Sequence, residues 1–191
     1  RMSPDLKIAT CFVMPLGGSS PRGSLGYAAC AAEILRQADA LGVHFDRIIV
    51  PNGSAGTHSG LLAGVTLAHS STQIAGYTVL ATEDQAAATT LEKTRQVLQL
   101  LDPRATLAES AVSVDGSQRG EAYGAPTEAM LDAVRLLASH EGLLTDPVYG
   151  GKAFAGLLAA VRAGDYPAGS NLLFVMTGGL PGIFAYRNAF D

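Results

Sequence analysis

The chain alternates apolar, strand-like runs with helix-like segments at short intervals, and this alternation constrains its fold more than any other feature of the sequence. The strand-like runs are continuously apolar, which is typical of strands buried on both faces. Regular alternation of strand and helix with short connections indicates a parallel sheet covered by helices. We therefore predict an α/β fold with an open, mainly parallel sheet and helices on both faces.

The boundaries of these elements can be predicted from apolar periodicity and from glycine and proline positions. Strands are expected over residues 7–14, 45–50, 73–80 and 171–176. Helices are expected over residues 24–41, 57–68, 84–101, 128–140 and 152–163, and from about residue 181. The polar stretch 114–127, with three glycines and a proline, is expected to be one long loop. No repeat or linker divides the sequence, so residues 1–191 are expected to form a single α/β domain.

Composition excludes several classes of protein. The 191 residues carry 13 Lys and Arg against 17 Asp and Glu, and a net charge of −4 gives no basic surface for nucleic acid. The longest run without charge, 48–82, is interrupted by proline, glycine and many Ser and Thr residues, which argues against a membrane span. Cys11 and Cys30 cannot form a disulfide framework. We therefore expect a cytoplasmic protein with neither a membrane nor a nucleic-acid partner.

The sharpest local motif is PNGSAGTHSG at residues 51–60, between a predicted strand and a predicted helix. Ligands of open α/β sheets bind at the carboxyl ends of strands, where a helix N-terminus offers unpaired N–H groups to an anion. Gly53 and Gly56 would let the backbone approach the anion and adopt positive φ, while Ser54 and Thr57 add hydroxyl donors. The motif predicts a phosphate site, with a plain Gly/Ser-rich turn as the alternative, and it fits neither nucleotide-binding glycine pattern.

Thr177 follows the predicted strand 171–176 directly and precedes two glycines. Because the carboxyl ends of parallel strands meet at one edge of a sheet, we expect Thr177 to lie near Ser54 and Thr57. A Gly-Gly turn with a solvated threonine is the alternative.

Tyr149 lies in the segment DPVYGGK, which enters a predicted helix. It would act as a general acid or base if its neighbours lowered its pKa, whereas most tyrosines in such a setting only pack and hydrogen-bond. Lys152, at the start of that helix, is expected to be a surface or ion-pairing residue. The four histidines lack metal-ligand spacing and no GxSxG motif is present, so neither a metal site nor a serine-hydrolase triad is expected.

Four motifs occur in the order PNGSAGTHSG, GEAYGAPTE, EGLLTDPVYGGKAFAGLL and LLFVMTGGLPGIFAY. Together they resemble the D-cysteine desulfhydrase and 1-aminocyclopropane-1-carboxylate (ACC) deaminase family, which are pyridoxal-phosphate (PLP) enzymes of amino-acid metabolism with the tryptophan-synthase-β fold. The resemblance runs from residue 15 to 186 and covers only the later part of the family's usual length. It implies the larger domain of PLP fold type II, incomplete relative to the family.

The resemblance also implies roles for individual residues. It implies that the cofactor phosphate is held by Gly53, Ser54, Ala55, Gly56 and Thr57. It implies that Thr177 hydrogen-bonds the pyridine nitrogen, and that Tyr149 and Tyr123 serve proton transfer or substrate orientation.

Two positions bear on the substrate. In the family, the deaminases look as if they carry Glu directly after the DPVY tyrosine and Leu before the paired glycines, where this chain has Gly150 and Thr177. Thr177 favours the desulfhydrase branch, whereas Gly150 departs from both branches, since desulfhydrases usually have Thr there. The resemblance thus implies a D-cysteine desulfhydrase, which forms pyruvate, ammonia and hydrogen sulfide. The alternatives are an ACC deaminase, which forms 2-oxobutanoate and ammonia, and a non-catalytic remnant that binds a phosphate-bearing ligand.

In the family, the lysine that forms a Schiff base with the cofactor lies upstream of all four motifs. Nothing before Lys7 can supply it, and Lys152 belongs to a motif that does not carry it. We therefore expect this chain to correspond to the C-terminal part of such an enzyme, without the lysine-bearing N-terminal part, and to be inactive or nearly so by itself. The partners that the resemblance implies are a small amino-acid substrate, a second copy in a homodimer and the N-terminal segment.

Overall fold

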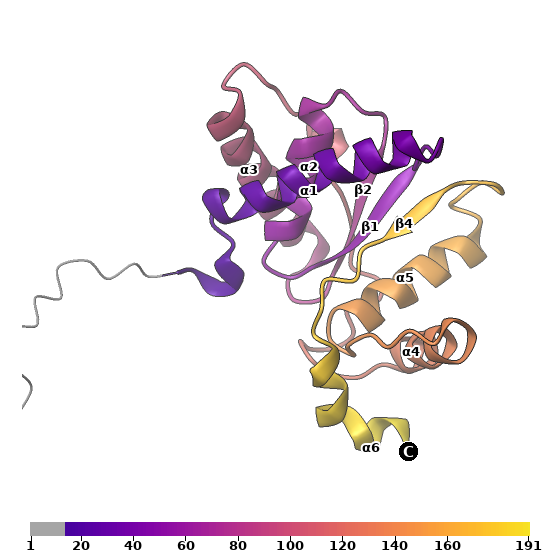
Figure 1. Cartoon of the computed structure of the whole chain (residues 1–191). Helices are drawn as coiled ribbons and strands as arrows, with labels where there is room; N and C mark the ends of the chain where they lie inside the picture. Colours follow the sequence, from indigo (N-terminus) through magenta and orange to yellow (C-terminus); the bar gives the residue numbers. More distant parts are fainter. Residues whose placement is uncertain (1–13) are drawn as a thin grey trace, which may run out of the picture.

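A computed structural model describes residues 14–191 (Figure 1). The strand predicted over 7–14 lies outside the described residues, apart from its last position. The helices are α1 (Pro21–Ala40), α2 (Gly56–Leu67), α3 (Glu83–Leu101), α4 (Glu128–Glu141), α5 (Gly150–Ala163) and α6 (Arg187–Phe190). The strands are β1 (Arg47–Asn52), β2 (Gln73–Thr78), β3 (Ser113–Asp115) and β4 (Leu172–Phe174). Short 3-10 helices cover Leu16–Gly18, Glu109–Ala111 and Leu180–Tyr186.

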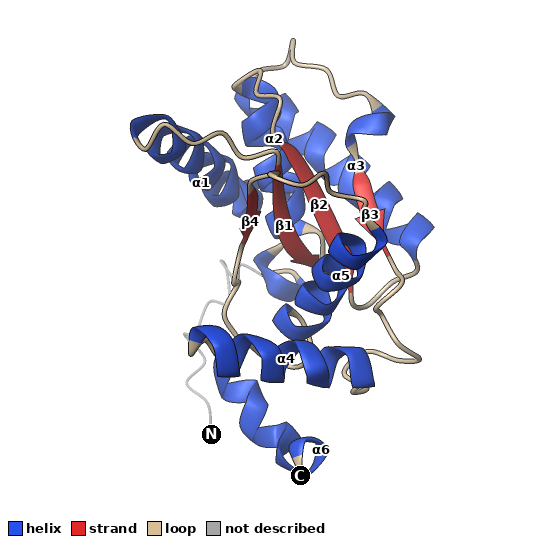
Figure 2. Ribbon diagram, turned by 90° about the vertical axis from the view of Figure 1, so that its right-hand side faces the viewer, coloured by secondary structure: helices blue, strands red, loops and turns tan. Residues whose placement is uncertain are grey.

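The four strands form one sheet in the order β3-β2-β1-β4, and every pair of neighbours is parallel (Figure 2). The central strand β1 pairs with β2 from Arg47 to Asn52 and with β4 from Arg47 to Ile49. Its apolar run is fully buried, as expected of a strand covered on both faces. The predicted parallel α/β sheet is therefore confirmed.

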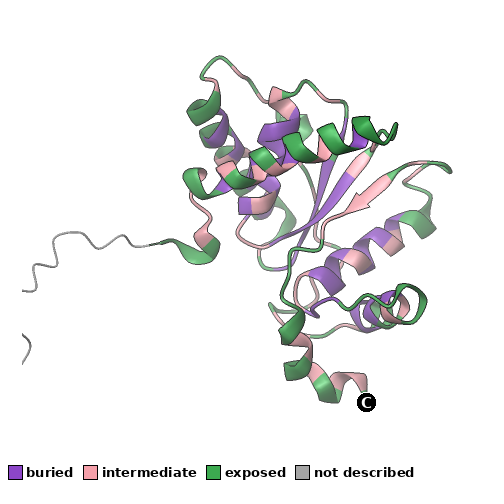
Figure 3. Cartoon of the chain, viewed as in Figure 1, coloured by how far each residue is buried: buried purple, intermediate pink, exposed green. Residues whose placement is uncertain are grey.

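Helices cover both faces of the sheet (Figures 1 and 3). On one face, Ile48 and Val50 pack with Leu61 of α2, and α1 and α3 lie beside α2. On the other face, Ile49 packs with Ala153 of α5. Among the described residues, no helix combines the length and the apolar character needed to cross a membrane.

Several boundary predictions were wrong, including the following three. The loop predicted over 114–127 begins too early, because β3 pairs Ala75 to Tyr77 of β2 with residues up to Asp115. The strand predicted over 45–50 ends too early, because Pro51 and Asn52 extend β1. Pro51 is tolerated there because the last residue of β1 that pairs with β4 is Ile49, so the N–H that proline lacks has no partner on that side. The helix predicted from residue 181 is instead the 3-10 helix Leu180–Tyr186 followed by the four-residue α6.

Candidate active site

The turn between β1 and α2 is built around an alanine in an unusual conformation. Ala55 is the N-cap of α2 and has φ 65°, in the left-handed region, which costs a non-glycine residue about 1 kcal/mol. Gly53 and Gly56 were expected to take positive φ, but neither does. The alanine side chain cannot cap the helix, so the N–H groups of the first turn of α2 remain available to an anion.

Gly53 and Gly56 are instead required by close approach. A Cβ on Gly53 would come within 2.9 Å of Tyr149 Cε1, and a Cβ on Gly56 would come within 2.5 Å of Ser19 Oγ. Both distances are too short for a side chain to be accommodated without movement. The two glycines therefore let a tyrosine ring and the segment before α1 pack directly against the turn.

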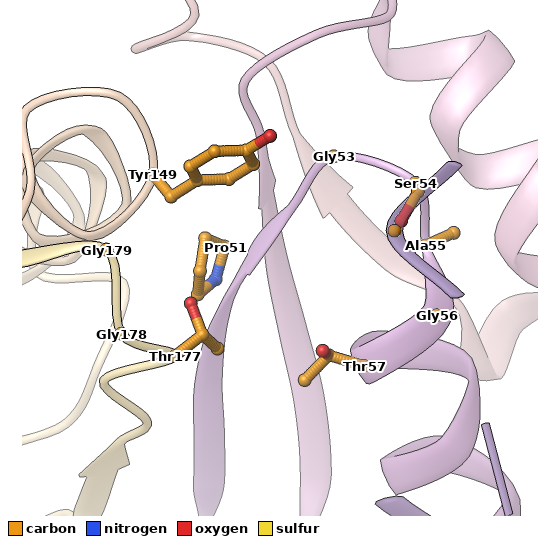
Figure 4. Close-up of a pocket in the computed structure, with 11 residues that line it drawn as sticks. Pro51, Gly53, Ser54, Ala55, Gly56, Thr57, Tyr149, Thr177, Gly178 and Gly179 are labelled. Carbon is orange, nitrogen blue, oxygen red and sulfur yellow. The ribbon is translucent and has the colours of Figure 1, made fainter. Parts of the chain in front are cut away.

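A cavity of about 270 Å³ opens at this edge of the sheet (Figure 4). Its lining joins the β1–α2 turn to the start of α5 and to the segment after β4, and it consists of Gly17, Pro51, Gly53, Ser54, Ala55, Gly56, Thr57, Tyr149, Thr177, Gly178 and Gly179. Tyr149 and Thr177 lie across the cavity from residues 54–57 (Figure 4). The prediction that Thr177 lies near Ser54 and Thr57 is thus confirmed, because all three residues line this cavity. All of these lining residues are uncharged.

A lysine side chain from α3 contacts the backbone of the turn. Lys93 of α3 donates hydrogen bonds from Nζ to the carbonyl oxygens of Ser19, at 2.7 Å, and Ser54, at 2.9 Å. The hydroxyls of Ser19 and Ser54 are also hydrogen-bonded to each other. Burial lowers the pKa of Lys93 from its ordinary value. Sequence reasoning missed this residue, because nothing in the pattern of α3 distinguishes a lysine that reaches a distant loop from one in solvent.

A buried polar cluster ties the turn to the helices below it. Asn52 Nδ2 lies 3.0 Å from His58 Nδ1 and donates to Thr90 Oγ1 at 3.0 Å. His58 is completely buried, and this burial lowers its pKa to about 4. The imidazole is therefore neutral at physiological pH and serves as an acceptor for the asparagine amide. The cluster fixes the end of β1 against α2 and α3.

Tyr149 and Tyr123 form a hydrogen-bonded pair. Their hydroxyl oxygens lie 2.7 Å apart, and their rings meet edge to face at 5.9 Å between centroids. Tyr149 is the N-cap residue of α5, where the Asp146 carboxylate accepts hydrogen bonds from the N–H groups of Val148, Tyr149 and Gly150. Tyr123 belongs to the loop between β3 and α4; its side chain is half exposed and does not line the cavity.

The pKa of Tyr149 is raised to about 12, first by burial and then by its hydrogen bond with Tyr123. A lowered pKa was the condition under which Tyr149 would act as a general acid or base, and the structure does not meet it. At neutral pH the phenol keeps its proton and can donate it, and Tyr123 is placed to exchange a proton with it. The raised pKa therefore disfavours proton abstraction by Tyr149 at neutral pH, whereas an acid role would rest on the position of its hydroxyl, because a raised pKa makes the phenol a weaker acid.

Lys152 was expected at the surface or in an ion pair, and this was wrong. Only 1% of its surface is exposed, and no acidic side chain among the described residues forms an ion pair with it. The physical reason is that the loop between β3 and α4 folds over the first turn of α5 and supplies backbone carbonyl acceptors. Among residues 14–191, no group of three His, Cys, Asp or Glu side chains could hold a metal ion.

Comparisons with known proteins agree with this arrangement. Residues 5–178 match the family model described as pyridoxal-phosphate dependent enzyme. The chain is 39% identical to a D-cysteine desulfhydrase of Serratia proteamaculans, over 92% of this chain and 52% of that protein. It is 36% identical to a 1-aminocyclopropane-1-carboxylate deaminase of Ralstonia pickettii, over 94% of this chain and 53% of that protein.

A crystal structure of an ACC deaminase homologue superimposes with a TM-score of 0.84 at 31% identity, covering 94% of this chain and 52% of the homologue. The chain thus spans about half the length of the curated relatives that it matches.

Proposed function

This chain belongs to the family of pyridoxal-phosphate dependent enzymes, and from that premise we propose that it forms the phosphate-binding side of a lyase acting on a small amino acid. The substrate that we propose is D-cysteine, which with one water gives pyruvate, ammonia and hydrogen sulfide. The observation that carries the proposal is the cavity in which the β1–α2 turn, Tyr149 and Thr177 meet.

Residues 53–57 are proposed to bind the cofactor phosphate, and the structure of the turn supports this. The uncapped N-terminus of α2 presents backbone N–H groups and the positive end of the helix dipole. Ser54 and Thr57 add hydroxyl donors, and the ammonium group of Lys93 adds positive charge behind the turn. The glycine at position 56 lets the segment before α1 pack against the turn, because a Cβ there would come within 2.5 Å of Ser19 Oγ.

The remaining residues are proposed to act on the rest of the cofactor and on the substrate. Pyridoxal phosphate, when bound, supplies an electron sink for negative charge at the substrate α-carbon. Thr177, across the cavity from the turn, has a hydroxyl suited to hydrogen-bond a pyridine nitrogen. Tyr149 keeps its proton at neutral pH and is proposed to donate it on the substrate side, with Tyr123 as its proton partner.

The identity to the Serratia desulfhydrase and the threonine at position 177 support D-cysteine as the substrate. An ACC deaminase is the second candidate, which the 36% identity to the Ralstonia enzyme favours. We further propose that the enzyme works in the cytoplasm as a homodimer, which size-exclusion chromatography with light scattering would test.

Product analysis of the full protein tests the substrate. Pyruvate and sulfide are measured with D-cysteine and with L-cysteine, and 2-oxobutanoate is measured with ACC. Sulfide from D-cysteine alone supports the proposal, whereas 2-oxobutanoate from ACC without sulfide from D-cysteine assigns the second function. The variant Tyr149→Phe keeps the ring over Gly53 and removes only the hydroxyl, so it shows whether product formation depends on that hydroxyl.

A further inference from the structure

Lys152 is the largest fully buried side chain of the described residues, and the proposed reaction gives it no role. It does not line the cavity. Burial lowers its pKa, and the nearby positive charge of Arg119 lowers it further. A buried ammonium group is costly unless its hydrogen bonds are satisfied, so the contacts that it makes indicate why it is there.

The ammonium group holds one loop. Lys152 Nζ donates to the carbonyl oxygen of Arg119 at 2.6 Å and to that of Ala122 at 3.4 Å. Both carbonyls belong to the segment 116–127 between β3 and α4, which we call the tyrosine loop because it carries Tyr123. The second anchored residue immediately precedes Tyr123 in the chain.

The tyrosine loop has little structure of its own. Within it, backbone hydrogen bonds join Arg119 N to Gly116 O and Ala125 N to Ala122 O. Its first residue is held by Glu83, and Tyr186 donates a hydrogen bond to Gly124 O at 2.6 Å. Between these ends, the carbonyl contacts of Lys152 fix the middle of the loop.

The first turn of α5 therefore influences the positions of both tyrosines. Tyr149 is the N-cap residue of α5, and Lys152 lies three residues later, within the first turn. The same turn that places Tyr149 in the cavity thus carries the group that holds the Tyr123 loop. A displacement of that loop would separate the hydroxyls that now lie 2.7 Å apart.

We propose that Lys152 is a positioning residue, whose ammonium group anchors the tyrosine loop by its backbone carbonyls and so keeps Tyr123 in hydrogen-bond contact with Tyr149. Lysine suits this task because its three N–H donors reach two carbonyls at once and charge strengthens each bond. The importance of the pair for turnover rests on the proposed function. The anchoring of the loop does not.

The anchoring is tested by hydrogen–deuterium exchange in the full protein, comparing the wild type with Lys152→Met. Methionine keeps the length and burial of the side chain but has no donor. We expect the backbone-hydrogen-bonded amides of the loop, those of Arg119 and Ala125, to exchange about tenfold faster, while those of α4 and the later turns of α5 keep their protection. Unchanged exchange in the tyrosine loop of a folded Lys152→Met protein would overturn the proposal.

Gly120→Ala strains the loop between the two carbonyls that Lys152 binds, and it serves if Lys152→Met does not fold. Gly120 has φ +75°, and a Cβ there would lie 3.5 Å from Lys152 Nζ and 2.8 Å from Thr127 Cγ2. The control is Gly124→Ala, which imposes the same backbone strain at φ +76° within the same loop, where the added Cβ would lie 3.1 Å from Tyr186 Oη and not beside Lys152. Faster exchange of the Arg119 amide in Gly120→Ala but not in Gly124→Ala supports the proposal, and equal exchange of that amide in both contradicts it.

A double-mutant cycle with Tyr123→Phe tests the link to the tyrosine pair. We expect Lys152→Met to lower kcat about tenfold or more with little change in KM, since misplacement of a reacting group affects turnover more than binding. In the Tyr123→Phe background the same substitution should have almost no further effect. Losses that multiply would show that Lys152 acts independently of Tyr123. If the wild type forms no product, the proposed function fails while the exchange experiment still decides the anchoring.

Discussion

The ring of Tyr149 lies directly over Gly53, so close that a Cβ on the glycine would come within 2.9 Å of Tyr149 Cε1. This contact joins the turn after β1 to the start of α5, two segments that are far apart in the chain. Both residues line the cavity, so the contact forms part of its wall.

We expect Gly53→Ala to push the Tyr149 ring away and to lower kcat/KM about a hundredfold, because an ångström-scale shift near the reacting centre has effects of that size. The control is Gly26→Ala on α1, where an added Cβ meets nothing within 4 Å. That variant should keep full activity and gain up to about 1 kcal/mol of stability from better helix propensity. Steady-state kinetics and thermal unfolding check both results, and an active Gly53→Ala enzyme would contradict the steric argument.

Lys93→Met should weaken cofactor binding about tenfold and lower the free energy of unfolding by about 2 kcal/mol, because the carbonyls of Ser19 and Ser54 lose a charged donor. Absorbance titration with pyridoxal phosphate measures the affinity. Arg95→Met, on the exposed side of the same helix, removes a cation whose ion pair lies in solvent. Equal cofactor affinities for the two variants would refute a role of Lys93 in holding the turn.

Buried His58 should make stability depend on pH. Its folded-state pKa of about 4 lies below its ordinary value of 6.5, so the unfolded chain binds more protons between these values. The contribution, about 3 kcal/mol, is fully present above pH 6.5 and is lost as the pH falls through 4. Urea unfolding at several pH values should show that His58→Gln flattens this dependence. If both proteins lose stability in parallel on acidification, the histidine is not responsible.

Thr177→Val is nearly isosteric and removes only the hydroxyl from the cavity wall. Because Thr177 lies across from the turn, we expect kcat to fall about tenfold or more while the affinity for the cofactor changes little. Ser54→Ala should show the opposite balance, with weaker cofactor affinity. A Thr177→Val enzyme with unchanged kcat would exclude the proposed contact with the pyridine nitrogen.

The amino-acid sequence predicts the parts of the site that follow from topology. The carboxyl ends of parallel strands converge at one edge of a sheet, and this rule alone predicts that Thr177 lies near Ser54 and Thr57. The rule concerns the backbone and is therefore independent of details of side-chain packing.

Lys93 and Lys152 escaped prediction because each binds backbone carbonyls that are distant in sequence. A carbonyl is present at every position, so no residue type marks such a partner. The strained turn was misjudged for a related reason: two glycines offered the positive φ, but Tyr149 and Ser19 crowd them, and Ala55 takes it instead. The three-residue β3 was not predicted, because its apolar signal is too short to be distinguished from the polar stretch that follows.

The pairing of β1 with β4 also determines when, during synthesis of the chain, the site can form. Asp46 and Asn171, which are hydrogen-bonded beside this pair of strands, are 125 residues apart, and contacts of such separation form slowly. During synthesis the turn after β1 emerges before β4, the strand that brings Thr177 to it, because β4 follows the other strands of the described residues. The complete lining of the cavity therefore comes together only after β4 and Thr177 have left the ribosome.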